Sequence, residues 1–287
     1  MRDFITYAVY RLLGSLVGRM PPRVGYRVTA WLGRLLYLLS PRLRSVLAGN
    51  IGQVTGPDVG ESQLEALVQQ ACVNIVKGHY DLFRVGRLTA EDIEELSQVE
   101  GWDNLEEALA LGRGVLVFSA HVGNVEVVMQ LAVIRGLAAA APGQRIRPDR
   151  LFQYTLCLRT SQGLKLIPTG EPMIGLLRTL KRGGLVGLAA DRDVADGART
   201  VDFFGLPTRL PDGPVRLALR TSAPLVPAFA LRLVDNSFQV QIGPRLELPQ
   251  TGDHETDVAA GMALVAQAME RHIAQHPEQW LVAQPIW

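Results

Sequence analysis

A histidine and a glutamate five positions apart, His121 and Glu126, have the types and spacing that most clearly suggest chemistry in this chain. The histidine follows an apolar run, Val115–Ser119, that predicts a buried strand, and the small residues after it predict a turn into a helix. In open α/β sheets, ligands bind at the carboxyl ends of the strands. A nearby carboxylate orients an imidazole and stabilises its charged form, as a general base requires. The alternative is a packed histidine near a surface glutamate.

A second group of charged residues follows another apolar run. Asp191 and Asp193 come directly after residues 185–190, and Arg192 lies between them. If the two strands are parallel, these carboxylates lie at the same edge of the sheet as His121. The alternatives are solvated loop carboxylates, and an arginine that forms a salt bridge with either of them.

Short apolar runs alternate with segments of helical periodicity after residue 114. The predicted strands cover residues 115–119, 137–141, 164–168, 185–190, 225–231 and 238–242. The predicted helices cover residues 62–83, 102–111, 124–135, 149–162, 171–182, 212–222 and 255–275. This alternation predicts an α/β fold with a central mixed, largely parallel sheet flanked by helices.

The N-terminal segment differs from the rest in charge. Residues 1–50 contain eight arginines and one aspartate, a net charge of +7, so the rest of the chain carries −6 of the overall +1. Residues 4–20 and 26–40 are apolar, but arginines interrupt both, and a bilayer span needs about 20 mainly apolar residues. We therefore expect two helices that lie on an anionic membrane surface without crossing it. The alternative is two amphipathic helices that cover the domain's own core.

The domain prediction follows from this contrast: residues 1–50 form a basic, membrane-associating arm, and residues 51–287 form a single α/β domain. An apolar content of 48% is enough for a large core. Cys72 and Cys157 lie in apolar helical patterns and are predicted to be small core residues. No histidines are paired at zinc spacing, so we expect no metal site, and we expect no nucleic-acid partner. The Gly-x-Ser-x-Gly turn of many hydrolases is absent.

Several motifs occur together in one order. The first is His121-x-Gly123-Asn124-x-Glu126, which resembles the His-x4-Asp/Glu signature of the glycerolipid and lipid A acyltransferases. The segments that follow are Arg-Thr-Ser-Gln-Gly at 159–163, Ala-Asp-Arg-Asp at 190–193, Val-Asp-Phe-Phe-Gly at 201–205 and Pro-Leu-Val-Pro at 224–227. Their order and spacing resemble the lipid A acyltransferase family, most strongly its phosphatidylinositol mannoside acyltransferase branch.

The resemblance implies a membrane-associated acyltransferase. Such an enzyme moves a fatty acyl group from acyl-CoA or acyl carrier protein, each a donor substrate, to a hydroxyl group of a glycolipid such as phosphatidylinositol mannoside or a lipid A-like acceptor. It needs no further cofactor. The resemblance implies that His121 is the general base with Glu126 as its partner, and Asp191 is the alternative partner. It also implies a location on the cytoplasmic face of the inner membrane.

The resemblance also implies a set of substrate-binding residues. Arg159 is expected to bind a phosphate or polar head group, because its planar guanidinium can donate two hydrogen bonds to one such group. The alternative is a solvated surface arginine. Phe203 and Phe204 are expected to form a wall of the acyl slot, with simple core packing as the alternative. The remaining residues of the set are Asn124, Asp191, Arg192 and Asp193.

Two other functions share this scaffold. A lysophospholipid or glycerol-phosphate acyltransferase usually has His-x4-Asp and a Glu-Gly block, and neither occurs here. A noncatalytic lipid-binding protein is the alternative from another class, and the presence of both His121 and Glu126 argues against it.

Overall fold

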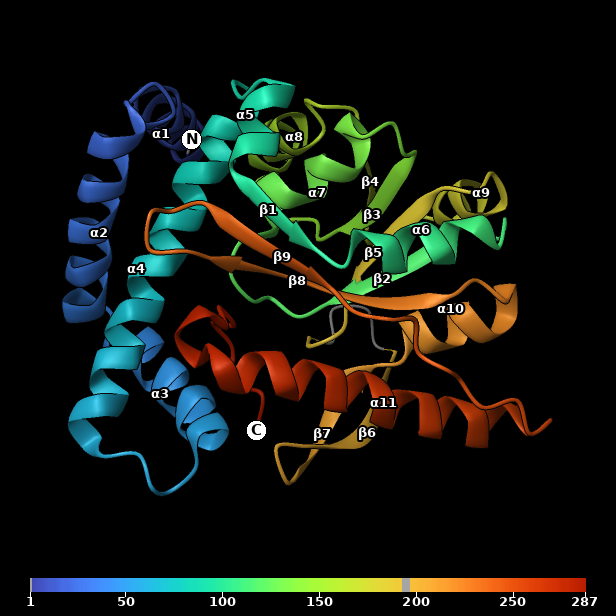
Figure 1. The fold of residues 1–287 in the computed structure, drawn as a ribbon. Helices are drawn as coiled ribbons and strands as arrows, with labels where there is room; N and C mark the ends of the chain where they lie inside the picture. The colour runs from blue at the N-terminus through green and yellow to red at the C-terminus, as the bar shows by residue number, and fades with distance from the viewer. Residues whose placement is uncertain (1, 193–196) are drawn as a thin grey trace.

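The structure, a computed structural model, describes residues 2–192 and 197–287 and is built around a seven-stranded sheet (Figure 1). Its strand order is β1-β9-β8-β2-β5-β3-β4. The strands are β1 (Ser97–Glu100), β9 (Phe238–Ile242), β8 (Leu225–Arg232), β2 (Val115–Ser119), β5 (Leu185–Ala189), β3 (Ala139–Gly143) and β4 (Lys165–Pro168). The β8–β9 pairing is antiparallel, and the other pairings of this sheet are parallel. The predicted mixed, largely parallel sheet is therefore confirmed.

Helices surround the sheet. Those that follow the arm are α4 (Glu61–Val85), α5 (Ala90–Glu95), α6 (Trp102–Ala110), α7 (Val125–Ile134), α8 (Asp149–Arg159), α9 (Ile174–Lys181), α10 (Gly213–Thr221) and α11 (His254–Gln275). A hairpin of β6 (Ala198–Phe203) and β7 (Leu206–Pro211) packs against α11, outside the main sheet (Figure 1). A 3₁₀ turn, Pro277–Gln279, precedes the C-terminal segment.

The two faces of the sheet pack differently. Side chains of a strand alternate between the faces, and Leu116 and Phe118 of β2 join the main core with residues of α10 and α11. Val115 and Val117 point to the other face, where Leu105 of α6 packs. Figure 1 shows α10 and α11 on one side of the sheet and α6 and α7 on the other. The second face holds the candidate site.

The arm forms three helices, α1 (Arg2–Val17), α2 (Pro22–Leu39) and α3 (Pro41–Thr55), so the predicted boundary at residue 50 falls inside α3. In Figure 1, α2 runs alongside α4. The close approach depends on Gly33, since a Cβ atom there would lie 2.4 Å from the Cα atom of Val73. No helix within the described residues has the length and apolar character needed to span a membrane.

Some elements of the structure were not predicted from the sequence. Strand β1 has the sequence Ser-Gln-Val-Glu, too polar and short to be recognised, and the β6–β7 hairpin pairs only with itself within the described chain. The burial of Cys72 was predicted correctly, but Cys157 is exposed on α8, so its prediction as a core residue was wrong. Helical periodicity placed Cys157 in an apolar stripe, whereas packing against neighbouring elements selects which stripe is covered.

The contact between α2 and α4 yields a prediction about stability. Gly33→Ala should lower the free energy of unfolding by about 1–3 kcal/mol, because the new methyl group overlaps the α4 backbone. Gly49→Ala in α3 is the matched control: no atom lies within 4 Å of its added Cβ, so alanine should raise stability by up to about 1 kcal/mol. Urea unfolding of both variants measures the difference. Equal effects of the two substitutions would mean that α2 and α4 are not in this close contact.

Candidate active site

The register of two parallel strands brings His121 and Asp191 together. Ser119 at the end of β2 pairs with Ala189 at the end of β5, and His121 and Asp191 each follow two residues later. The imidazole Nδ1 lies 2.6 Å from Asp191 Oδ1, and the backbone N–H of His121 donates to Oδ2 at 2.8 Å. The two carboxyl ends therefore open at the same edge of the sheet, and Asp191 is the carboxylate that contacts the imidazole.

Asp191 is a fully buried carboxylate with several donors around it. Its exposed fraction is 0%, and the Trp280 indole Nε1–H donates to Oδ2 at 2.9 Å. Burial by itself would raise the pKa of the Asp191 carboxyl, but the attraction of His121 and the hydrogen bonds from His121 and Trp280 outweigh it and hold the pKa below its ordinary value. The side chain is therefore a carboxylate at neutral pH.

Glu126 has a different partner from the one the sequence predicts. It forms an ion pair with Arg159 at the end of α8, in which Arg159 Nε lies 2.8 Å from Glu126 Oε2 and Nη2 contacts Oε1. Burial would lower the pKa of Arg159, but the Glu126 carboxylate raises it above its ordinary value. Glu126, which has the expected spacing from His121, thus holds Arg159 in place. Asp191, 70 residues from His121 in the sequence, is the carboxylate that contacts the imidazole.

The turn that carries these residues is held by the chain's C-terminal segment. The backbone oxygen of His121 accepts from the N–H of Leu281 at 2.8 Å, and the N–H of Gly123 donates to Gln279 at 2.8 Å. Gly123 has a φ of +63°, and a Cβ atom there would lie 1.7 Å from the oxygen of Ala230. Only glycine fits this approach of the turn to β8.

Three backbone N–H groups at the start of α7 already have hydrogen-bond partners. Asn124 is its N-cap, and its side-chain oxygen accepts from the N–H of Glu126 at 2.8 Å. The N–H groups of Gly123 and Asn124 donate to Gln279 and Ala230. These three donors already have partners, so they stabilise the turn and are not available for an oxyanion.

A cavity of about 550 Å³ adjoins His121, between the sheet and α7. Its walls on the sheet side are mostly small, and side chains of α6 and α7 complete it. The small lining residues are Ser119, Ala139, Ala141, Gly143, Gly187, Ala189, Ala228 and Ala230. The larger apolar ones include Trp102, Leu105, Val125, Val128, Met129, Val240 and Ile242. The result is an apolar chamber with a histidine at its wall.

Charged and polar residues also line the cavity. Arg159, Glu126 and Arg192 all line the cavity, and Arg192 Nη2 donates to Gln144 at 2.8 Å. Tyr10 of α1 also lines it, and burial raises the pKa of Tyr10 to about 12. The arm thus contributes directly to the cavity.

The other predicted site residues lie elsewhere. Phe203 and Phe204 do not line this cavity; they pack with Trp280 and Trp287 against the main core, so core packing, the alternative named from the sequence, is what the structure has. Asp193 lies outside the described residues.

The sequence did not indicate the contacts that two residues make at the site. Trp280, which donates to Asp191, belongs to a C-terminal segment that returns to the sheet edge only in the fold. Tyr10 lies in an apolar helix whose covered face the pattern alone could not identify. Both depend on contacts between segments far apart in sequence.

The chain matches the model of the bacterial lipid A biosynthesis acyltransferase family over residues 1–287. It is 33% identical over 193 residues to a phosphatidylinositol mannoside acyltransferase of Mycobacterium tuberculosis, an alignment that covers 66% of this chain and spans 59% of that relative. It is 26% identical over 245 residues to the Mycolicibacterium smegmatis protein of the same name, covering 84% of this chain and 78% of the relative. It is 25% identical over 187 residues to the lipid A biosynthesis palmitoleoyltransferase of Escherichia coli, covering 64% and 58%. As the order of motifs predicts, this chain belongs to the bacterial lipid A biosynthesis acyltransferase family.

Proposed function

We propose that this protein transfers a fatty acyl group from a thioester to a hydroxyl group of a glycolipid, of the phosphatidylinositol mannoside or lipid A class. The observation that carries the proposal is the His121–Asp191 pair on the wall of an apolar cavity. The names of the relatives, phosphatidylinositol mannoside acyltransferase and lipid A biosynthesis palmitoleoyltransferase, support the acceptor class. The donor is acyl-CoA or acyl carrier protein.

In the proposed reaction His121 is the general base. Since its Nδ1 is bonded to Asp191, Nε2 takes the proton of the acceptor hydroxyl as the oxygen attacks the thioester carbonyl. The buried Asp191 carboxylate stabilises the resulting imidazolium. When the tetrahedral intermediate collapses, the C–S bond breaks, and the thiolate takes the proton from Nε2. The products are an ester and a free thiol.

The cavity next to His121 is suited to the acyl chain. Its lining is mainly apolar, and from Leu185 to Ala189 the strand below it extends roughly 13 Å. The cavity lining combines small side chains, such as Ala189 and Gly187, with bulkier apolar ones, such as Leu105. This apolar lining beside the histidine supports an acyl pocket whose carbonyl end lies at His121.

The charged groups are suited to the polar parts of the substrates. Arg159, held by Glu126, presents a guanidinium to the cavity, and we assign it to an anionic group of the donor or acceptor. A second cavity of about 730 Å³ adjoins the first and shares with it the wall residues Pro142, Thr169, Leu188, Ala189 and Arg192. Two neighbouring cavities suit a reaction that joins two large substrates.

The arm supports association with a membrane surface. Its first two helices expose many large apolar side chains: Phe4, Ile5, Val9, Leu12, Leu13 and Leu16 on α1, and Val24, Trp31, Leu32, Leu38 and Leu39 on α2. Exposed arginines lie among them, at positions 11, 19, 23, 27 and 34. Apolar side chains inserted between lipids, with arginines near anionic head groups, would hold the protein on a bilayer. The cytoplasmic face remains the predicted side.

The first functional prediction concerns the base. His121→Ala and Asp191→Asn should each lower kcat by at least about 100-fold, because one removes the base and the other its stabilising charge. His79→Ala is the matched control, since His79 lines the same cavity but, among the described residues, its ring bonds only to the backbone oxygen of Ile75. Its kcat should stay near that of the wild type. Acyl transfer at the wild-type rate by a folded His121→Ala protein, checked by circular dichroism, would rule out the mechanism.

The second prediction concerns the acyl pocket. Gly187 lies on the cavity wall, and an added Cβ there meets only Ala141, at 4.0 Å, so a larger side chain fits by taking up cavity space. Gly187→Val should lower kcat/KM for a hexadecanoyl donor by about tenfold or more relative to an octanoyl donor. Both donors are assayed with the same protein, so loss of folded enzyme cancels in the ratio. An unchanged ratio would place the acyl chain elsewhere.

The third prediction concerns the membrane. Replacing Arg23, Arg27 and Arg34 of α2 by glutamine should weaken co-sedimentation with anionic vesicles by roughly 100-fold, since each basic residue near the surface contributes about 1 kcal/mol. The matched control removes Arg178, Lys181 and Arg182, equally exposed, at α9 on the opposite side of the fold (Figure 1). Equal weakening by both triple variants would show a nonspecific effect of charge.

A further inference from the structure

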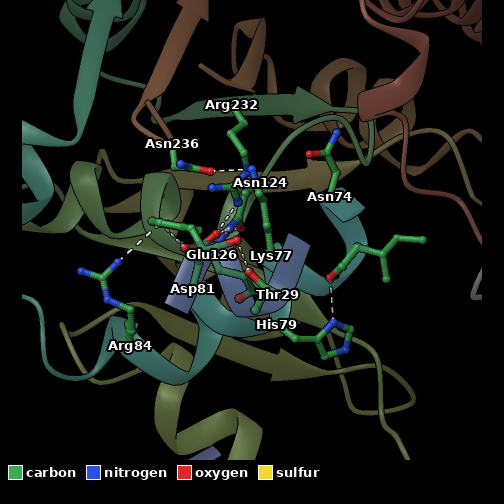
Figure 2. A network of polar contacts seen from close by, with 12 residues as sticks. Thr29, Asn74, Lys77, His79, Asp81, Arg84, Asn124, Glu126, Arg232 and Asn236 are labelled. Carbon is green, nitrogen blue, oxygen red and sulfur yellow. Dashed lines mark hydrogen bonds and ion pairs between the residues drawn. The ribbon is translucent and has the colours of Figure 1, made fainter. Parts of the chain in front are cut away.

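A second buried carboxylate lies behind the catalytic turn, and the reaction proposed above does not use it. Asp81 of α4 is 1% exposed, and three side chains from distant segments reach it. The Tyr26 hydroxyl of α2 donates to Oδ1 at 2.6 Å. The amide of Asn124 and the guanidinium of Arg232 both donate to Oδ2. Figure 2 shows the side chains of Asn124 and Arg232 directed toward Asp81.

Arg232 makes this an ion pair inside the protein. It is the last residue of β8, is 7% exposed, and its guanidinium lies over the rings of Tyr26 and Phe238 at 5.6 Å and 4.9 Å from their centroids. Its backbone N–H donates to the Gln279 side chain at 2.7 Å. The partner of Asp81 is therefore fixed at both its backbone and its side chain, so Asp81 is held at a defined place.

Asn124 connects this pair to the catalytic turn. Its side-chain NH₂ donates to Asp81, while its side-chain oxygen accepts from the N–H of Glu126, and it is 4% exposed. The amide can serve both partners only in one orientation, which Asp81 selects because a carboxylate only accepts. Asp81 thus sets the orientation in which Asn124 caps α7 and places Glu126, the partner of Arg159.

We propose that Asp81 is a positioning residue for acyl transfer: it orients Asn124 and thereby fixes residues 121–126 against α4, α2 and β8. The predicted effects on kcat and KM rest on the proposed function. It assigns to Asp81 and Arg232 a role that neither spacing nor motif indicates. Because Tyr26 lies on α2, the same network ties the arm to the catalytic turn.

The test separates capping from positioning. Serine is as good an N-cap as asparagine but is too short to reach Asp81, so Asn124→Ser keeps the cap and removes the link. It should lower kcat by about 10- to 100-fold and leave KM for the acyl donor within about twofold, as expected for misplaced catalytic groups. Thr89→Ser is the matched control: Thr89 caps α5 through the N–H of Asp92 and lines neither cavity, so its replacement should change neither constant.

A swap of the two side chains tests the pair directly. Asn124→Asp places two carboxylates together, and its kcat should be lower than that of the wild type, although aspartate is an equally good cap. The double variant Asp81→Asn/Asn124→Asp restores one amide and one carboxylate beside Arg232. It should recover at least about tenfold in kcat over Asn124→Asp. Recovery is the result that a role in capping alone does not produce.

A measurement without turnover keeps the inference separate from the proposed function. Hydrogen exchange of the amides in residues 121–126 should accelerate by at least about tenfold in Asn124→Ser and return toward the wild-type rate in the swap. A wild-type protein that transfers no acyl group while its exchange follows this pattern would refute the function and support the positioning. The inference would be overturned if Asn124→Ser kept the wild-type kcat and exchange rates, or if the swap had neither a higher kcat nor slower exchange than Asn124→Asp.

Discussion

The structure of the site depends on keeping one carboxylate charged in a place that water does not reach. Asp191 is fully buried, and an isolated charge there would be unstable. Two N–H groups of His121 and the indole of Trp280 supply the hydrogen bonds that replace water. Each donor imposes a condition on the fold: a fixed register between β2 and β5, and a C-terminal segment that returns to the sheet edge.

The second condition explains why the turn at residues 121–126 lies so close to the C-terminal segment. Residues 279–281 form hydrogen bonds with both His121 and Gly123, so the same short segment that supplies the indole also fixes the backbone of the turn. On the other side, the turn lies against β8 so closely that only glycine fits at position 123. The histidine is therefore held by backbone contacts as well as by its own side-chain bond.

The sheet serves two purposes because its faces carry different side chains. On β2 and β8, large residues such as Phe118 and Phe229 point into the main core. The opposite face carries Ala228 and Ala230 on β8 and Gly187 on β5, and there the cavity lies. Alternation along each strand lets one sheet contribute tight packing to the fold and open apolar space to the site.

The sequence by itself determined the fold class, the family and most of the cavity's charged residues, because apolar periodicity and motif order are local properties. The strands ending before His121 and Asp191 were recognisable from their apolar runs, and their parallel arrangement placed both residues at one edge. Which carboxylate contacts the histidine was decided by tertiary structure. Glu126 has the right spacing, but α7 turns it toward Arg159, whereas β-sheet register brings in Asp191. Likewise, the roles of Trp280, Asp81 and Arg232 arise from contacts between segments far apart in the chain, and no local pattern records such contacts.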